Sequence, residues 1–173
     1  MDTSLPTPTA GDETTWVAEH LADLVIGSIA ASPSIRGGQT AADRAVEAFD
    51  VTGYANRRNE VYPRSRRGAS GLSPYIRHGL VSLPHMWKAV AGGPNADVAK
   101  FRDELLWQEY ARHLYARTAG ASTSLRHHVP ERTAAPDADW VGEMACLNLV
   151  LDELTDDGWL VNQTRMWFAS HWS

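Results

Sequence analysis

Three side chains with complementary chemistry lie close together in the stretch DELLWQEYARHL. Glu104, Trp107 and Gln108 occupy positions i, i+3 and i+4, which places them on one face of a helix. A carboxylate, an indole ring and an amide on one face can hydrogen-bond to a planar ligand and stack on it. Leu105 and Leu106 are expected to point toward the core. A surface glutamate beside a half-buried tryptophan has the same spacing, so the pattern alone leaves both interpretations open.

The segment RRNEVYPRSRRGASGLSP is a second group with possible chemistry. Its Gly/Ser loop leads directly into an expected helix, whose free N–H groups and dipole favour an anion. The hydroxyls of Ser70 and Ser73 can donate to such an anion. A solvated basic loop, in which Ser73 only caps the helix, is the alternative interpretation. The arginines before the loop are Arg57, Arg58, Arg64, Arg66 and Arg67.

The segment GWLVNQTRMWFASHWS carries the third group. Asn162 and Arg165 stand at i and i+3 on an expected final helix, just after the break at Gly158. Their amide and guanidinium groups therefore share one face. The alternative is an amphipathic terminal helix that packs through Trp159 and Met166.

No histidine or cysteine pattern predicts a metal site. His127 and His128 are adjacent, so their side chains diverge, and no other set has zinc spacing. Cys146 is the only cysteine, which excludes an internal disulfide and fits a reducing compartment. We therefore expect no metal and a cytoplasmic location.

The length of 173 residues predicts one domain, and 43 % apolar residues suffice for a core. No apolar run reaches 18 residues, so no membrane span is expected. The Pro- and Thr-rich start lacks the features of a signal peptide and predicts a disordered leader over residues 1–14. The helical domain is expected over residues 15–173.

The charge is distributed unevenly along the chain. The net charge is −5, but residues 57–132 hold thirteen Arg and Lys against six Asp and Glu. An overall acidic chain therefore does not exclude a local anion site. Most of the basic residues are arginines, which suit bidentate phosphate contacts, although a preference for arginine codons gives the same composition.

Helical periodicity dominates the chain and indicates an all-α fold. Val17, Leu21, Leu24, Val25 and Ile29 form a stripe on a first helix that Thr14 or Thr15 caps. The other expected helices begin at Thr40, at Pro74 after an N-cap Ser73, after the N-cap Ser82, at Val98 (ending near Ala119), at Trp140 (ending near Thr155) and at Trp159.

Five blocks in order resemble the FAD-binding region of the DNA photolyase/cryptochrome family. They are GGQTAADRAVEAF, YANRRN, GASGLSPYIRHGLVS, DELLWQEYARHL and ELTDDGWLVNQTRM, from about residue 37 to the C-terminus. Linked blocks are more specific than any single motif. The resemblance implies a multi-helix orthogonal bundle that holds FAD in a folded conformation. It also implies blue-light-driven electron transfer to UV-damaged DNA, as in deoxyribodipyrimidine photolyases.

The resemblance also implies roles for individual residues. The positions that match cofactor-binding residues are Tyr54, Ser70, Leu72, Ser73, Asn162 and Arg165. The positions that match catalytic residues, close to the flavin or to the lesion, are Glu104, Trp107 and Asn162. The positions that match residues facing damaged DNA are Trp107, Gln108 and Gln163. In such a site an aromatic ring stacks on the flipped base and a carboxylate hydrogen-bonds to it.

The chain departs from the family pattern at several polar positions. Ala69 and Gly71 replace the usual Thr and Arg of the loop, and Gln108 replaces an Arg. Val161 and Gln163 replace a His and an Arg. Fewer phosphate contacts weaken DNA binding. The chain also lacks the antenna domain and the C-terminal stretch that closes the flavin pocket, so we expect a C-terminally truncated pocket that binds FAD weakly.

Two other function classes fit the same residues. A non-catalytic helical module that binds nucleic acid through the Arg57–Arg67 cluster and Trp107 would show salt-sensitive DNA binding without flavin. A helical interaction protein with exposed C-terminal tryptophans would self-associate without a cofactor.

Overall fold

The computed structural model describes residues 4–25, 27–118 and 144–172. The expected all-α class is confirmed, because the described residues form helices and contain no strand. None of the described helices is long and apolar enough to cross a membrane. The α-helices are α1 (Glu13–His20), α2 (Gln39–Ala48), α3 (Tyr54–Arg57), α4 (Ser73–Arg77), α5 (Leu83–Ala89), α6 (Asn95–Thr118), α7 (Ala145–Asp157) and α8 (Asn162–Trp172).

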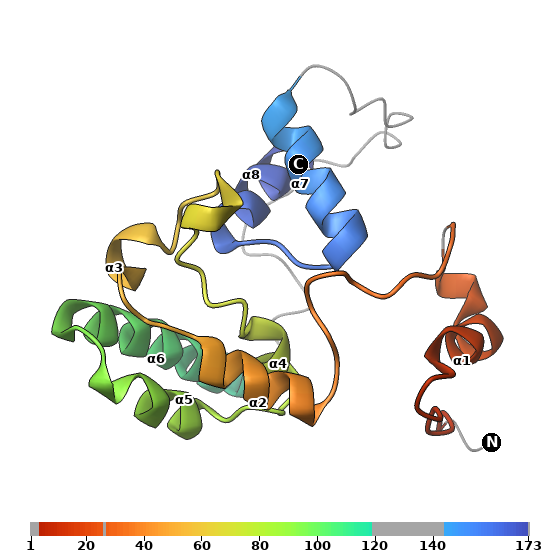
Figure 1. Cartoon of the computed structure of the whole chain (residues 1–173), viewed down its shortest axis with the longest axis horizontal. Helices are drawn as coiled ribbons and strands as arrows, with labels where there is room; N and C mark the ends of the chain where they lie inside the picture. Colours follow the sequence, from red (N-terminus) through yellow and green to blue (C-terminus); the bar gives the residue numbers. More distant parts are fainter. Residues whose placement is uncertain (1–3, 26, 119–143, 173) are drawn as a thin grey trace.

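The main core lies between α2, α4, α5 and α6. Ala42, Leu72 and Met86 are completely buried in it, and Phe101 and Leu105 contribute from α6. Figure 1 shows α2, α5 and α6 packed together, with α7 and α8 as a separate pair on the other side of the α3–α4 connection. Residues 64–66 in that connection form a short 3-10 turn.

An aromatic cluster joins α3 to the core. The rings of Phe49, Tyr54 and Phe101 lie with centroids 5.0–6.4 Å apart, mostly edge to face. Such pairs are favourable beyond their buried area. The cluster places Tyr54, the first residue of α3, against the middle of α6.

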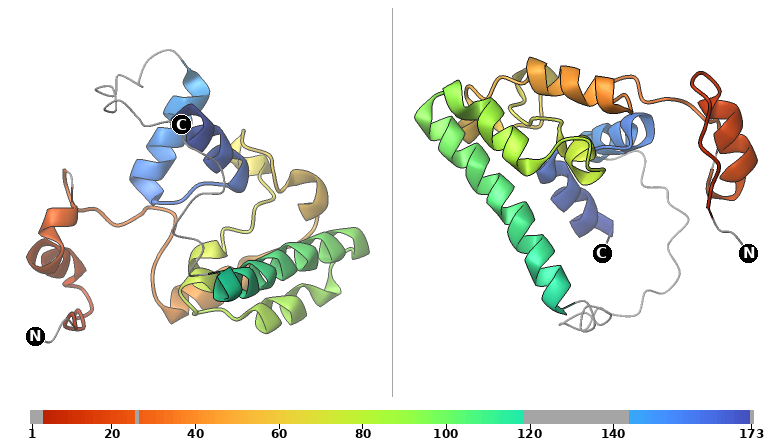
Figure 2. Two further views of the ribbon diagram at one scale, coloured as in Figure 1. Left: turned by 180° about the vertical axis from the view of Figure 1, so that it is seen from behind. Right: turned by 90° about the horizontal axis from the view of Figure 1, so that it is seen from below.

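The first expected helix is wrong in both its start and its length. Helix α1 begins after Asp12 rather than Thr14 or Thr15, and it ends at His20, followed by a 3-10 turn at Ala22–Leu24. No residue of α1 is fully buried and Leu24 is 76 % exposed, so the expected stripe does not form a buried face among the described residues. Figures 1 and 2 show α1 lying apart from the other helices.

The helices from residue 39 onward agree better with the sequence. Helix α2 begins one residue before the expected Thr40, and Ser82 caps α5 by accepting from the His85 N–H at 3.2 Å. Helix α6 begins three residues before Val98. Trp140 and Ala119, the expected start of α7 and end of α6, lie outside the described residues.

One expectation about the C-terminal helices is confirmed and one needs correction. Gly158 ends α7 in the left-handed conformation, with φ of 63°, as its type suggests. Helix α8 then begins at Asn162 rather than Trp159, since Trp159, Leu160 and Val161 form the connection. The α7–α8 pair buries residues of its own, which are Leu147, Val150, Glu153, Leu160, Val161 and Thr164.

Candidate functional site

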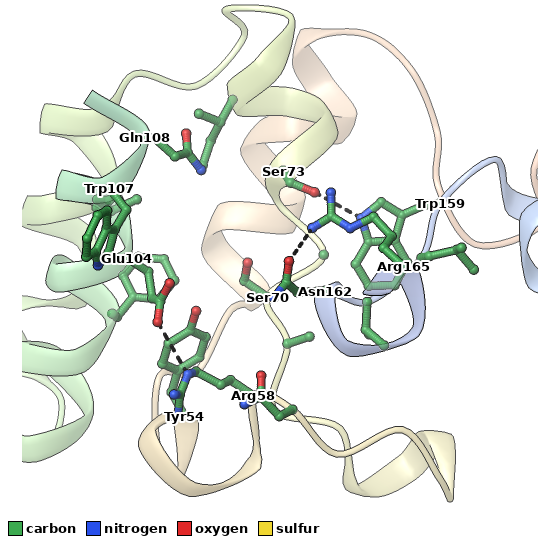
Figure 3. Close-up of a pocket in the computed structure, with 18 of the residues that line it drawn as sticks. Tyr54, Arg58, Ser70, Ser73, Glu104, Trp107, Gln108, Trp159, Asn162 and Arg165 are labelled. Atoms are coloured by element: carbon green, nitrogen blue, oxygen red, sulfur yellow. Dashed lines mark hydrogen bonds and ion pairs between the residues drawn. The ribbon is translucent and has the colours of Figure 1, made fainter. Parts of the chain in front are cut away.

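A cavity of about 450 Å³ lies where α3, α4, α6 and the start of α8 meet (Figure 3). Two of the ten sequence-predicted site residues do not line it: Leu72 is completely buried in the core, and Gln163 lies elsewhere on α8. The eight predicted residues that do line it are Tyr54, Ser70, Ser73, Glu104, Trp107, Gln108, Asn162 and Arg165. The structure therefore gathers residues from three distant parts of the chain around one space.

One wall of the cavity is the face of α6 that the sequence indicated. Glu104, Trp107 and Gln108 all line the cavity, and Trp107 is 60 % exposed. Leu105 is buried as expected, at the base of this wall. Leu106 was expected in the core, but it is 57 % exposed.

Two cations hold the carboxylate of Glu104. The Arg58 Nε lies 3.4 Å and the Lys100 Nζ lies 2.9 Å from Glu104 Oε1. The hydrogen bond to Glu104 raises the pKa of Lys100, with a further contribution from Asp103. An ionised carboxylate is only an acceptor. This side of the cavity therefore offers an acceptor to ligand N–H or O–H groups.

Tyr54 lies beside this carboxylate and stays neutral. Burial raises the pKa of the Tyr54 phenol to about 12, and the negative charge of Glu104 adds to the effect. Its position depends on α6, because Asp97 accepts hydrogen bonds from the Gly53 and Ala55 N–H groups, each at 2.8 Å. Gly53 has φ of 80°, which favours glycine at this entry to α3.

The opposite wall presents mainly donors. Ser70 Oγ accepts from the Leu72 N–H at 3.3 Å, and Ser73 Oγ accepts from the Trp159 indole N–H at 2.9 Å. Arg165 Nη2 donates to Asn162 Oδ1 at 3.3 Å, as their i, i+3 spacing predicts. These contacts leave the two hydroxyl protons, the Asn162 amide N–H groups and the guanidinium to donate. We call Ser70, Ser73, Asn162 and Arg165 the donor wall.

The expected capping role of Ser73 needs correction. Ser73 does not cap α4, because Leu72 occupies the N-cap position and no side-chain capping bond forms there. Helix α4 has five residues, and its dipole is correspondingly small. The hydroxyl of Ser73 is instead engaged by Trp159 across the cavity wall.

The arginine cluster is also not a free basic patch. Glu153, which is 2 % exposed, lies 2.9 Å from Arg64 Nε and 2.7 Å from Arg67 Nη2. Arg66 pairs with Glu60 at 2.9 Å. The remaining two arginines contact Thr52 and Glu104. Three carboxylates thus pair with four of the five arginines, so much of the charge of the cluster is already engaged within the fold.

Sequence reasoning gave no site role to Trp159 and none specific to Arg58, yet both line the cavity. Trp159 and the loop at residues 69–71 also border a second cavity of about 390 Å³, which Arg67 and Glu153 line. Trp159 could have been identified as a site residue from its position directly after the helix break at Gly158 and three residues before Asn162.

Within the described ranges, no three His, Cys, Asp or Glu side chains gather closely enough to hold a metal ion. His127 and His128 lie outside those ranges.

The chain is 28 % identical over 155 residues to a deoxyribodipyrimidine photo-lyase from a Synechococcus species. The match covers 79 % of this chain but 31 % of that protein, so the chain spans about a third of its length. No family model matches the chain, and no solved structure matches it. The similarity supports the relationship to photolyases that the five sequence blocks predicted.

Proposed function

We propose that the chain is a flavin-binding helical unit of the photolyase type, in which the 450 Å³ cavity binds FAD. The observation that carries the proposal is the convergence of eight motif residues, from α3, α4, α6 and α8, on that one cavity. The volume falls within the roughly 300–1,000 Å³ typical of small-ligand pockets. The similarity to a photo-lyase supports the same assignment.

The polarity of the cavity fits a flavin nucleotide. Ligand phosphate and hydroxyl oxygens need donors, and the donor wall supplies hydroxyl, amide and guanidinium groups. A flavin or pyrimidine ring bears N–H groups, and Glu104 supplies an acceptor on the opposite side. The phenol of Tyr54 stays protonated at neutral pH and adds a donor. Tyr54, Ser70, Ser73, Asn162 and Arg165 would hold the cofactor.

The α6 face would receive a base from damaged DNA. Trp107 is 60 % exposed, so its ring is accessible for stacking, and Glu104 and Gln108 lie beside it. FAD, once bound and reduced, would supply a light-excited electron for repair of the lesion and recover it afterward. The protein's own residues would orient the base, hold the Glu104 carboxylate in place through Arg58 and Lys100, and exclude water.

The test is the absorbance spectrum of the purified full chain after expression with added riboflavin. Flavin bands that persist through desalting, with the flavin identified as FAD, are the expected result. A colourless protein whose melting temperature FAD does not raise would refute the proposal.

A charge substitution locates the flavin in this cavity. Ser73→Asp places a negative charge on the donor wall and is expected to weaken FAD binding at least tenfold, since a like charge faces the phosphates. Ser65→Asp is the matched control, because Ser65 is exposed and lies outside the cavity. Equal FAD affinity of both variants and the wild type, by fluorescence titration, would contradict the assignment.

A further inference from the structure

Trp159 makes a contact that spans 86 positions of the chain. Its indole N–H donates to Ser73 Oγ at 2.9 Å, and both side chains are partly buried (Figure 3). The left-handed Gly158 ends α7 and turns the chain so that Trp159 faces the loop before α4. The bond therefore connects the α7–α8 pair to the first residue of α4.

The bond fixes which hydrogen-bonding groups of Ser73 remain available. Ser73 is the first residue of α4, and Leu72 occupies the N-cap position, so the Ser73 hydroxyl is not needed as a cap. A hydroxyl has one proton and two lone pairs, so accepting from the indole leaves the proton to donate. Trp159 therefore holds the Ser73 oxygen at the cavity wall and leaves its proton available.

We propose that Trp159 is a positioning residue that presents the Ser73 hydroxyl as a donor to a phosphate-bearing ligand in the main cavity. The inference rests on the proposed flavin function and adds a residue that acts through Ser73. Trp159 lines the cavity, but its indole N–H is occupied by Ser73. Its contribution to phosphate binding is therefore indirect.

The test compares FAD with riboflavin, which lacks the phosphates. Trp159→Phe keeps a ring but removes the N–H, and Ser73→Ala removes the hydroxyl. Each is expected to weaken FAD binding about tenfold, the upper range for one hydrogen bond, and to leave riboflavin binding within about twofold. The double variant should bind FAD no more weakly than either single one, because both remove the same interaction. Trp167→Phe, on α8 but outside the cavity lining, is the matched control.

Three outcomes would overturn the inference. These are additive losses in the double variant, equal losses for FAD and riboflavin, or FAD binding by Trp159→Phe as tight as that of the wild type. Failure of the proposed function looks different, because the wild type itself would then retain no flavin.

A measurement without flavin keeps the inference testable in that case. Inorganic pyrophosphate is titrated into the isotope-labelled chain, and the indole N–H signal of Trp159 is followed by NMR. A saturable shift that is lost in Ser73→Ala supports the inference. No shift in the wild type, together with the absence of flavin, would refute both proposals.

Discussion

The carboxylate of Asp97 holds the start of α3, and this role can be tested by mutation. It lies in the first turn of α6 and is 8 % exposed. Its Oδ2 accepts from the Gly53 N–H and its Oδ1 from the Ala55 N–H, both at 2.8 Å. The two bonds hold the start of α3 and therefore the backbone of Tyr54. Asp97→Ala should loosen this wall of the cavity as well as destabilise the fold.

The magnitude follows from the two orphaned donors. A buried N–H that loses its partner costs about 1–3 kcal/mol, and bonds to a charged acceptor lie at the upper end. Because the Gly53 and Ala55 N–H bonds are partly buried, the two groups together predict a loss of about 1–3 kcal/mol, a sizeable part of the roughly 5–15 kcal/mol that stabilises a typical domain. Asp97→Asn should cost less, since its amide keeps one acceptor oxygen and sets its NH₂ group against the other N–H.

Urea unfolding followed by circular dichroism measures the free energy directly. Asp103→Ala is the control, because Asp103 is on the same helix but exposed and should change stability by less than about 1 kcal/mol. An Asp97→Ala variant within about 0.5 kcal/mol of the wild type, with an unchanged denaturant slope, would show that the two bonds contribute little. The reasoning that places Tyr54 through Asp97 would then be wrong.

Three further predictions concern charged or titrating groups. Burial raises the pKa of Tyr54 to about 12. The contribution of the neutral phenol to stability is therefore fully present below the unfolded pKa of about 10 and is lost as the pH rises toward 12. In urea unfolding, the free energy of unfolding of the wild type should fall over this range relative to that of Tyr54→Phe. Glu153→Gln breaks two ion pairs of a buried carboxylate and should cost about 3–5 kcal/mol, whereas Glu60→Gln, whose arginine is exposed, should cost less than about 1 kcal/mol. Hydrogen bonds from Ser34 and Ser32 lower the pKa of Asp157, so the stability difference between wild type and Asp157→Asn should be present above about pH 4 and vanish in more acidic solution. Equal acid sensitivity of the two proteins would contradict this.

The sequence predicted helices well where the apolar periodicity agreed with the residues that begin and end helices. Ser82 and Pro84 marked the start of α5, and Gly158 marked the end of α7. The first expected helix, whose stripe ran through Ile29, instead ends at His20, and none of its residues is fully buried. Periodicity reports which residues share a face, but burial depends on tertiary partners that a local pattern does not contain.

Local spacing predicted the separate parts of the candidate site. That these parts come together was predictable only from the order of the motifs along the chain. The spacing of Glu104, Trp107 and Gln108 predicted a shared face, and the structure confirms that face. The ion pairs of the arginine cluster were not predicted, and the expected Ser73 cap was wrong, for the same reason. Their partners, Glu153 and Trp159, lie more than 80 residues away in the chain, and no local pattern reports such contacts.

The buried residues form two separate groups, and this affects how the cavity can open. The main core joins α2, α4, α5 and α6, whereas α7 and α8 bury a small set of their own. Polar contacts connect the two groups. Asp157 accepts a hydrogen bond from Ser34, Glu153 forms an ion pair with Arg67, and Trp159 donates to Ser73. The cavity has one wall on each group, so its width depends on these few polar contacts as well as on the apolar packing within each group. Native-state hydrogen exchange should accordingly show the two groups separating before either of them unfolds.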